Sequence, residues 1–388
     1  MIPLSYSLRS LMVRKATTAA TAFGIALVVF VFATALMLVE GISRTLGSAG
    51  DPSIAIVLRQ GSDAELASSI ENAHVGVVLA SRDVARRANG DPDGAAEVMG
   101  VIALDKIGDA GISNVAVRGV TEDSFAFRPN VHVVAGRRPN LGTDECMIGA
   151  AIRGRFAGMD LGQSFEIRHG RRVRVVGVFA DRGSSYESEA WVGVDSVRTA
   201  FGREGLVSVI RVRLRDPSAY ASFERSVEQN RQLGLDVQRE TTYLANQSEE
   251  SSKVLNGIGI AVAFFFSIAA MIGAMITMYA SVARRGREIG TLRALGFKRS
   301  NVLLAFLIES FALGLLGGAV GAAASTAMGL VRFSIINMGN WSELVFRFTP
   351  TPVILAKAMV FAAIMGLLGG FFPALRAARL SVLEALRA

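Results

Sequence analysis

Cysteine, histidine and charged residues are scarce in this sequence. Its 388 residues contain a single cysteine, Cys146, which excludes a disulfide scaffold. The three histidines, His74, His132 and His169, lack the paired His or Cys spacing that a metal site requires. No histidine signature marks Cys146 as a nucleophile, so it is interpreted as a packed thiol. We therefore predict no catalytic residue and no metal ligand.

A phosphate-binding loop of the form Gly-x-x-x-x-Gly-Lys-Ser/Thr is also missing. In ATP-binding proteins the backbone of such a loop cradles the phosphates. The chain is therefore expected to bind no nucleotide itself, and an enzyme is the disfavoured class of function.

Apolar residues, by contrast, are abundant. They make up 51% of the chain against 19% charged residues, and the mean hydropathy is positive. Four runs are nearly free of charge over the ~20 residues that a helix needs to cross ~30 Å of hydrocarbon. The first run is too long for a secretory signal and is expected to be retained. The sequence thus predicts a membrane protein with four spans, at 16–39, 254–282, 301–331 and 352–372.

The positive charges predict the orientation of these spans. Twelve arginines and lysines lie before the first span, between the second and third, or after the fourth, whereas the other short loop offers only Arg332 and Arg347. Positive loops stay inside, so both termini are expected in the cytoplasm and the large insert outside. The expected order is a cytoplasmic segment at 1–15, a span at 16–39, an outer domain with helical stalk ends at 40–253, a span at 254–282, a cytoplasmic loop at 283–300, a span at 301–331, a short outer loop at 332–351, a span at 352–372 and a cytoplasmic tail at 373–388.

The insert between the first two spans has the pattern of an α+β domain with two subdomains that share strands. We expect helices at 61–70 and 218–233 and strands at 54–58, 75–79, 98–104, 115–120, 145–148, 164–167, 171–179 and 209–214. Residues 41–252 carry 25 Lys and Arg against 28 Asp and Glu. Since the insert is slightly acidic, nucleic acid is excluded as a partner.

Polar and small residues inside the spans suggest helix packing. Glu309 is the one carboxylate within a span, and a structural pair with Lys298 or an arginine is favoured over a transport path. Glycines at four-residue spacing allow close helix contact in lipid, either within the chain, which is favoured, or at a homodimer seam. These glycines are Gly314, Gly317, Gly318, Gly321, Gly366 and Gly370.

The loop at 284–300 predicts a short amphipathic helix. Ile289, Leu292 and Leu295 with Gly296 would share one face, and Gly296 would end the helix in a left-handed conformation. Two interpretations remain open. The helix is held at the interface by anionic lipids, or it docks into a groove on a cytoplasmic motor.

Three motifs together resemble one known family. The segment Arg287-Glu-Ile-Gly-Thr-Leu-Arg-Ala-Leu-Gly-Phe297 precedes a span with Glu309 and Gly314-Leu-Leu-Gly-Gly-Ala-Val-Gly321, and the chain ends with Phe372-Pro-Ala-Leu-Arg-Ala-Ala-Arg-Leu-Ser-Val-Leu-Glu-Ala-Leu386. This combination resembles the MacB/LolC/FtsX family of ABC transporter permeases. By that resemblance, the coupling helix includes Arg287, Glu288, Ile289, Leu292, Arg293, Leu295, Gly296 and Phe297.

The resemblance implies a permease of the bacterial inner membrane that works by mechanotransmission. A dimer of cytoplasmic ATPase subunits would bind ATP and Mg²⁺ and dock on two permease copies, a homodimer or a related pair. MacB carries its ATPase domain ahead of the first span, whereas about fifteen residues precede it here, so this chain resembles the stand-alone permeases.

The cargo remains open at this stage. Export with a periplasmic adaptor and an outer-membrane channel is preferred. LolC-like extraction of lipoproteins or lipids is second, and an FtsX-type regulatory subunit is third. A membrane sensor that recruits no ATPase is the alternative from another class.

Overall fold

The computed structural model describes residues 15–47, 50–108, 111–168, 170–337 and 339–380. The chain divides into two compact units. We call residues 1–40, 254–331 and 347–388 the transmembrane unit, and Gly41–Lys253 with Arg332–Phe346 the globular unit. Residues 1–14 and 381–388, which belong to the predicted cytoplasmic segments at 1–15 and 373–388, and His169 lie outside the described residues.

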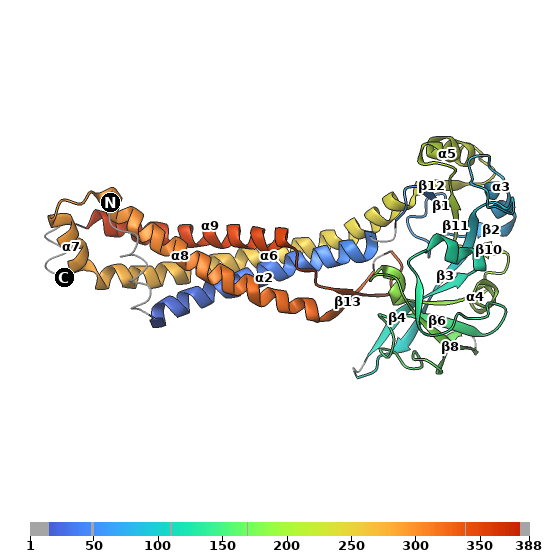
Figure 1. Cartoon of the computed structure of the whole chain (residues 1–388), viewed down its shortest axis with the longest axis horizontal. Coiled ribbons are helices and arrows are strands. Elements are labelled where there is room, and N and C mark those ends of the chain that lie inside the picture. The colour runs from blue at the N-terminus through green and yellow to red at the C-terminus, as the bar shows by residue number, and fades with distance from the viewer. Residues whose placement is uncertain (1–14, 48–49, 109–110, 169, 338, 381–388) are drawn as a thin grey trace. The chain divides into compact units, whose positions relative to one another are not determined.

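Among the described residues, four helices are long and apolar enough to cross a membrane, as predicted. They are α2 (Lys15–Gly47), α6 (Glu240–Arg284), α8 (Arg299–Thr326) and α9 (Pro352–Arg379), and the short α7 (Gly286–Ala294) lies between α6 and α8 in the chain (Figure 1). Each contains a stretch apolar enough to span a bilayer. The predicted fold class, four transmembrane helices with an α+β domain between the first two, is confirmed.

The helices differ from the predicted spans mainly in length. Because α2 continues to Gly47 and α6 begins at Glu240, both edges of the insert are helical, as their apolar spacing predicted. Helix α9 also runs past residue 372, through Pro373, to Arg379. A proline removes one backbone hydrogen bond without ending this helix, in which Pro373 and Ala374 are buried.

Close glycine contacts hold α8 against α9. A Cβ on Gly314 would lie 2.7 Å from the Ala362 carbonyl oxygen and 3.0 Å from the Gly366 Cα. A Cβ on Gly318 would meet the Ala362 Cβ at 2.5 Å, and one on Gly370 would clash with the Ser310 hydroxyl. No side chain fits at these positions, so the two backbones approach closely.

The other two glycines of the α8 repeat face α2. A Cβ on Gly317 would lie 2.6 Å from the Ala22 carbonyl oxygen, and one on Gly321 would clash with that of Ala26. All six glycines singled out in the sequence therefore pack within the chain. In contrast, only 11% of the span in α6 is buried, against 33 to 44% for the other three.

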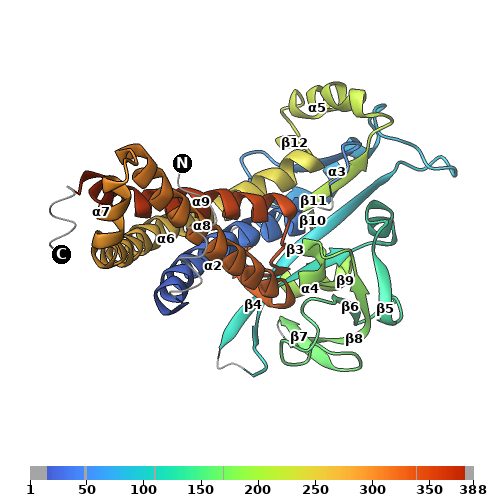
Figure 2. The same ribbon diagram turned by 60° about the vertical axis from the view of Figure 1, so that its left-hand side comes forward.

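The globular unit contains a mixed ten-stranded sheet in the part of the chain that the structure describes, with strand order β12-β1-β11-β3-β4-β9-β6-β8-β5 and β7 beside β8 (Figure 2). Most neighbours are antiparallel, but β4 with β9 and β6 with β8 are parallel. The strands are β1 (Ile54–Arg59), β3 (Gly94–Asp105), β4 (Ile112–Val120), β5 (His132–Gly136), β6 (Glu145–Gly149), β7 (Ser164–Arg168), β8 (Arg171–Ala180), β9 (Glu189–Gly193), β11 (Val209–Arg213) and β12 (Leu235–Arg239).

Three short helices belong to the same unit, α3 (Asn72–Leu79), α4 (Val194–Phe201) and α5 (Tyr220–Glu228), with a small pair of strands, β2 (Ile70–Glu71) and β10 (Leu206–Val207). One large apolar core runs through the unit, from β1 and β11 to β8. Strands such as β1 are buried over five consecutive residues, so both faces of the sheet are covered.

Two local predictions were wrong. The apolar run at 75–79 forms helix α3 rather than a strand, because so short a run does not reveal its period. Residues 61–69 form turns rather than a helix. There Glu65 is drawn into buried ion pairs and the Ser68 hydroxyl accepts a hydrogen bond from the Arg59 amide, so tertiary contacts override local preference.

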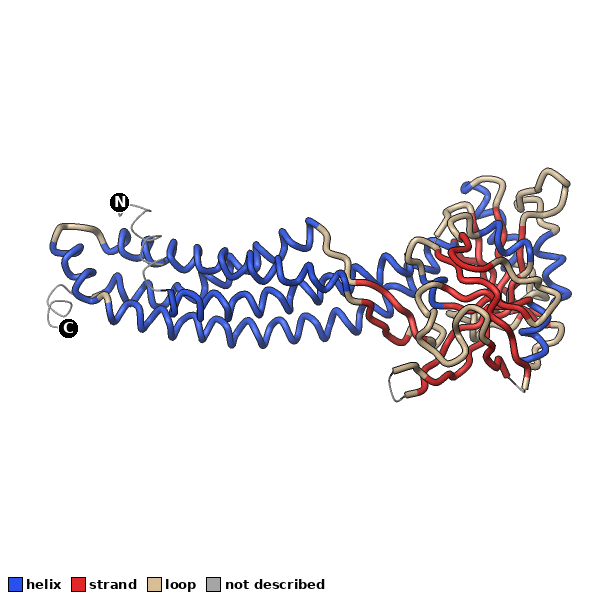
Figure 3. Tube along the Cα trace, turned by 60° about the horizontal axis from the view of Figure 1, so that its bottom comes forward, coloured by secondary structure: helices blue, strands red, loops and turns tan. Residues whose placement is uncertain are grey.

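The segment between the third and fourth spans is more ordered than the predicted loop. It contains a hairpin of β13 (Arg332–Ile336) and β14 (Glu343–Arg347). Although both neighbouring segments are spans, residues 332–346 belong to the globular unit. Figure 3 colours strands red and helices blue.

We expect Gly366→Ala to disrupt the contact of α9 with α8. A methyl group there would lie 2.6 Å from the Ser310 carbonyl oxygen and 2.9 Å from the Gly314 Cα. Overpacking of this kind costs about 1–3 kcal/mol. The measurement is thermal unfolding of the purified chain in detergent. The control is Gly273→Ala in α6, where a Cβ meets nothing within 4 Å; equal stability of the two variants would contradict the packing role.

Candidate functional site

The short helix predicted at 284–300 is present as α7, directly between α6 and α8. Its end has the hydrogen bonds of a Schellman motif, in which the Phe297 amide donates to the Leu292 carbonyl and the Gly296 amide to that of Arg293. Gly296 has a φ of +92°, a conformation that favours glycine. The predicted stop at Gly296 thus has a clear physical cause.

The sequence analysis predicted that the apolar residues in and just after α7 share one face. In the structure they do not. Ile289 is 2% exposed and packs with Met278 and Val302 of the neighbouring helices, whereas Leu295 is 72% exposed. Leu292 lies between these extremes. The single predicted face is therefore divided into an inner contact with the chain's own helices and an outer apolar tip.

The remaining members of the predicted set differ in exposure. Arg287 and Glu288 are exposed, whereas Arg293 and Phe297 are half-buried. A hydrogen bond of 3.2 Å from Arg293 Nη1 to the Phe297 carbonyl oxygen closes the end of the helix. An exposed apolar side chain with charged neighbours is a suitable contact for a protein partner.

Glu309 of α8 forms a buried ion pair with Arg285, the residue that precedes α7. The distance from Arg285 Nη1 to Glu309 Oε2 is 2.8 Å, and both side chains are 6% exposed. The same guanidinium contacts Glu288 at 3.0 Å and lies 5.0 Å from the centre of the Phe306 ring. The expected structural pair is thus made by an arginine rather than by Lys298.

A second concentration of charge is buried in the globular unit, and the sequence did not reveal it. It combines four carboxylates with three guanidinium groups, all at most 5% exposed. We call it the ionic cluster; its members are Glu65, Glu97, Arg118, Arg128, Glu189, Arg211 and Glu240.

Arg118 of β4 links three carboxylates of the ionic cluster. Its Nε and Nη2 atoms donate to the two oxygens of Glu189, each at 2.7 Å. Its Nη1 atom donates to Glu65 at 2.6 Å and to Glu97 at 2.9 Å. The two-pronged contact with Glu189 is the strong geometry of an arginine and a carboxylate.

Two further arginines complete the ionic cluster. Arg128 holds both oxygens of Glu97, at 2.6 and 2.7 Å. Arg211 of β11 donates to Glu65 at 2.5 Å and also pairs with Glu240, the first residue of α6. The cluster therefore ties the start of this long helix to the sheet.

The electrostatics of the ionic cluster are not uniform. Burial by itself would raise the pKa of Glu97, but Arg128 and Arg118 bring that pKa well below its usual range. Burial raises the pKa of Glu240, and the attraction of Arg211 does not reverse the shift. The surroundings therefore favour the charged form of Glu97 and disfavour that of Glu240.

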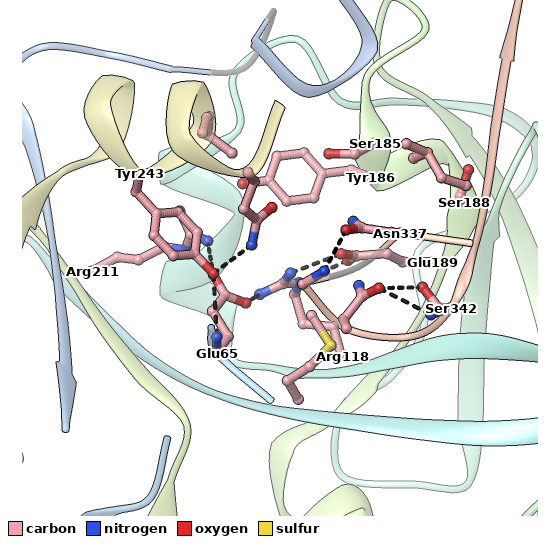
Figure 4. Close-up of a pocket in the computed structure, with 16 residues that line it drawn as sticks. Glu65, Arg118, Ser185, Tyr186, Ser188, Glu189, Arg211, Tyr243, Asn337 and Ser342 are labelled. Atoms are coloured by element: carbon pink, nitrogen blue, oxygen red, sulfur yellow. Dashed lines mark hydrogen bonds and ion pairs between the residues drawn. The ribbon is translucent and has the colours of Figure 1, made fainter. Parts of the chain in front are cut away.

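A cavity of about 30 Å³ borders the ionic cluster (Figure 4). Its lining includes Glu65, Arg118 and Glu189 together with Asn337 and Ser342 of the β13–β14 hairpin. Such a volume has room for about one or two water molecules. The arrangement therefore suits a structural joint rather than a substrate pocket.

Cys146 fits no chemical role in this structure. Its side chain is fully buried in β6, and burial, with a smaller contribution from Glu145, raises the pKa of the thiol. A thiol of this kind is a poor nucleophile at neutral pH.

Two protein families match this chain. The MacB-like periplasmic core domain matches residues 17–230, more than half of the chain, and the FtsX-like permease C-terminal domain matches residues 260–382.

Individual relatives are more distant. A macrolide export ATP-binding/permease protein MacB of Burkholderia cenocepacia is 30% identical over 225 residues, which are 55% of this chain and 31% of that protein. An uncharacterized ABC transporter permease of Methanocaldococcus jannaschii is 26% identical over 224 residues, 56% of this chain and 55% of that protein. The matches thus span a third to about half of these relatives' length.

Among solved structures, the periplasmic region of MacB from Actinobacillus actinomycetemcomitans aligns with 50% of this chain and 92% of its own length. The identity is 13% and the TM-score 0.38. A TM-score of this size supports no conclusion beyond the likeness itself.

We expect Arg118→Met to destabilise the globular unit by about 3–5 kcal/mol, because three buried carboxylates lose their shared cation. The measurement is denaturant unfolding of the full chain in detergent, followed by the fluorescence of buried Trp191 in a Trp341→Phe background. The matched control is Arg137→Met, which removes a pair with Glu145 whose arginine is 60% exposed, and little change is expected there. Equal effects of the two substitutions would contradict the role of the ionic cluster.

Proposed function

Because the chain belongs to the family of ABC transporter permeases with a MacB-like periplasmic core domain and an FtsX-like C-terminal domain, we propose that it is the permease subunit of an export machine. A separate cytoplasmic ATPase would bind ATP and Mg²⁺ and drive movement of the globular unit, without a channel through the spans. The observation that carries the proposal is α7, a short helix between two spans with its Leu295 side chain exposed.

The contacts of α7 suit the transfer of force. Ile289 packs into the transmembrane unit, and Arg285 joins the start of α7 to Glu309 of α8. A partner that gripped Leu295 would therefore move α6 and α8 together with α7. These two anchors replace the loose hinge that a loop of this length would otherwise provide.

The length of α6 supports the same mechanism. It is one helix from Glu240 to Arg284. It therefore includes both a span and Glu240, a member of the ionic cluster in the globular unit. An unbroken helix transmits a displacement that a flexible linker would absorb. Movement at α7 would reach the globular unit through the backbone of α6.

The distribution of charge supports an orientation with α7 and both termini in the cytoplasm and the globular unit outside the inner membrane. Arg284, Arg285, Arg287 and Arg293 flank or belong to α7, whereas the hairpin between the third and fourth spans has only Arg332 and Arg347. Positive residues near span ends stay on the cytoplasmic side.

The proposed assembly has two permease copies, most simply a homodimer, on an ATPase dimer. The MacB relative's name describes an ATP-binding exporter of macrolides. For the present chain we propose export through a periplasmic adaptor and an outer-membrane channel, with extraction of lipoproteins or lipids as the second candidate. Regulation of FtsX type is third.

We expect Leu295→Asp to reduce recovery of the ATPase with the affinity-tagged permease by about tenfold or more, because Leu295 is the proposed hot spot of the interface and loss of a hot-spot residue costs about 2 kcal/mol or more. Membrane insertion should not change, since the Leu295 side chain is 72% exposed. The control is Ile112→Asp, an equally exposed site at 70% in the globular unit. ATPase recovery that equals the wild-type level in Leu295→Asp would contradict docking at α7, and failure of the wild-type chain to bind any ATPase would refute the proposed function.

The orientation has its own test. A phosphatase, active only outside the cytoplasm, and a green fluorescent protein, fluorescent only inside, are fused after Gly94 and after Gly296. We expect phosphatase activity alone at the first position and fluorescence alone at the second. The same response at both positions would refute the topology.

A further inference from the structure

The β13–β14 hairpin is bound into the globular unit by its own core residues. Leu344, Val345 and Phe346 are 2 to 5% exposed, and Val345 belongs to the main apolar core of that unit. The Val345 amide donates a hydrogen bond of 3.0 Å to the Ser188 hydroxyl. This connection between two spans is thus a fixed part of the globular unit.

Glu343 is the charged anchor of the hairpin. Its side chain is 3% exposed and lies 2.8 Å from Lys106 Nζ and 2.7 Å from Arg155 Nη2. Burial by itself would raise the pKa of Glu343, but hydrogen bonds from Lys106 and Arg155 bring that pKa down to about 2. The carboxylate is therefore ionised and paired at neutral pH. A buried charge of this kind is costly to leave without its partners.

Further contacts place the hairpin against other parts of the same unit. Asn114 Nδ2 donates a hydrogen bond of 2.9 Å to the Trp341 carbonyl oxygen. A Cβ on Gly339 would lie 3.0 Å from the side chain of Gln247, in the first turns of α6. The hairpin thus contacts β4 at one point and α6 at another.

The order of the elements along the chain connects Glu343 to α7. The docking helix α7 is followed by α8, and one residue, Val331, separates the end of the third span at Leu330 from β13. On its other side α7 is preceded by α6, whose first residue, Glu240, pairs with Arg211. Both helices that flank α7 therefore lead along the chain to a buried glutamate of the globular unit.

We propose that Glu343 is a positioning residue that anchors the third span to the globular unit, so that the ATPase acts on this unit through α8 as well as through α6. The inference rests on the proposed function, because it assigns a second route to the same movement. A flexible loop in place of the anchored hairpin would leave α6 and α2 as the only helical routes.

The first test measures the anchor in the full chain alone. Hydrogen exchange of residues 332–346 is compared between wild type, Glu343→Gln and Lys106→Gln, with Glu204→Gln as control because Glu204 is exposed on the same unit. We expect exchange to accelerate about tenfold or more in the first two variants, since each removes a charged hydrogen bond. Exchange equal to the control in both would overturn the anchor. Lys106→Gln also provides the result if Glu343→Gln fails to fold.

The second test measures transmission in the complex with the co-purified ATPase. A non-hydrolysable ATP analogue with Mg²⁺ is added, and the change in exchange is followed at α7 and at the strand residues around Lys106. We expect the response at α7 to persist in Glu343→Gln while the response around Lys106 falls to less than half of the wild-type change. An undiminished response there in both variants would overturn the second route.

The two proposals fail in different ways. If α7 does not respond to nucleotide in the wild-type complex, the proposed function is contradicted, and transmission through Glu343 with it. The exchange of the hairpin in the chain alone would still decide whether Glu343 holds the hairpin. If α7 responds and the hairpin anchor has no effect, only the further inference is refuted.

Discussion

Within hydrocarbon, every backbone N–H and C=O group must find its partner inside the protein, and the structure of the transmembrane unit depends on this constraint. It requires helices, which need ~20 apolar residues each. Because lipid tails are as apolar as the side chains, the hydrophobic effect contributes little to the association of these helices. Close van der Waals contact at glycines such as Gly314 and Gly366 stabilises it instead. The hydrocarbon also makes a lone Glu309 expensive, and Arg285 offsets that cost. This pair also fixes the start of α7 against α8, because Arg285 lies between the end of α6 and the first residue of α7.

In the globular unit the same need for paired charge has a different consequence. Arg211, Glu97, Arg118 and Glu189 lie on β11, β3, β4 and β9, which are neighbours in that order. A shift of one strand by one residue would turn its charge to the opposite face and leave its partners buried and unpaired. Buried ion pairs add little net stability over apolar packing, so the effect of this row is to select one strand register rather than to strengthen the sheet.

The sequence predicts an element of this structure reliably where the apolar or alternating pattern of residues is long. The four spans and strands such as 98–104 and 171–179 follow from long apolar or alternating patterns, and the stop of α7 follows from Gly296. The strand expected at 75–79 was wrong because five apolar residues do not distinguish a strand from a helix. The ionic cluster and the hairpin anchor could not be predicted, because Glu343 and Lys106 are 237 positions apart and nothing local marks either as buried.

The division of α7 into an inner and an outer contact resolves a difficulty in the original one-face interpretation. If Ile289 and Leu295 both faced a partner, α7 would be attached to its own helices only by its ends, and the partner's movement would be lost in two short joints. With Ile289 packed inward and Arg285 paired with Glu309, the helix is braced against α6 and α8. Leu295 is exposed, and it is the residue at which we propose that the ATPase docks. In the proposed mechanism, a helix held at its base and exposed at its end would pass the movement of the ATPase to α6 and α8, with which it is packed.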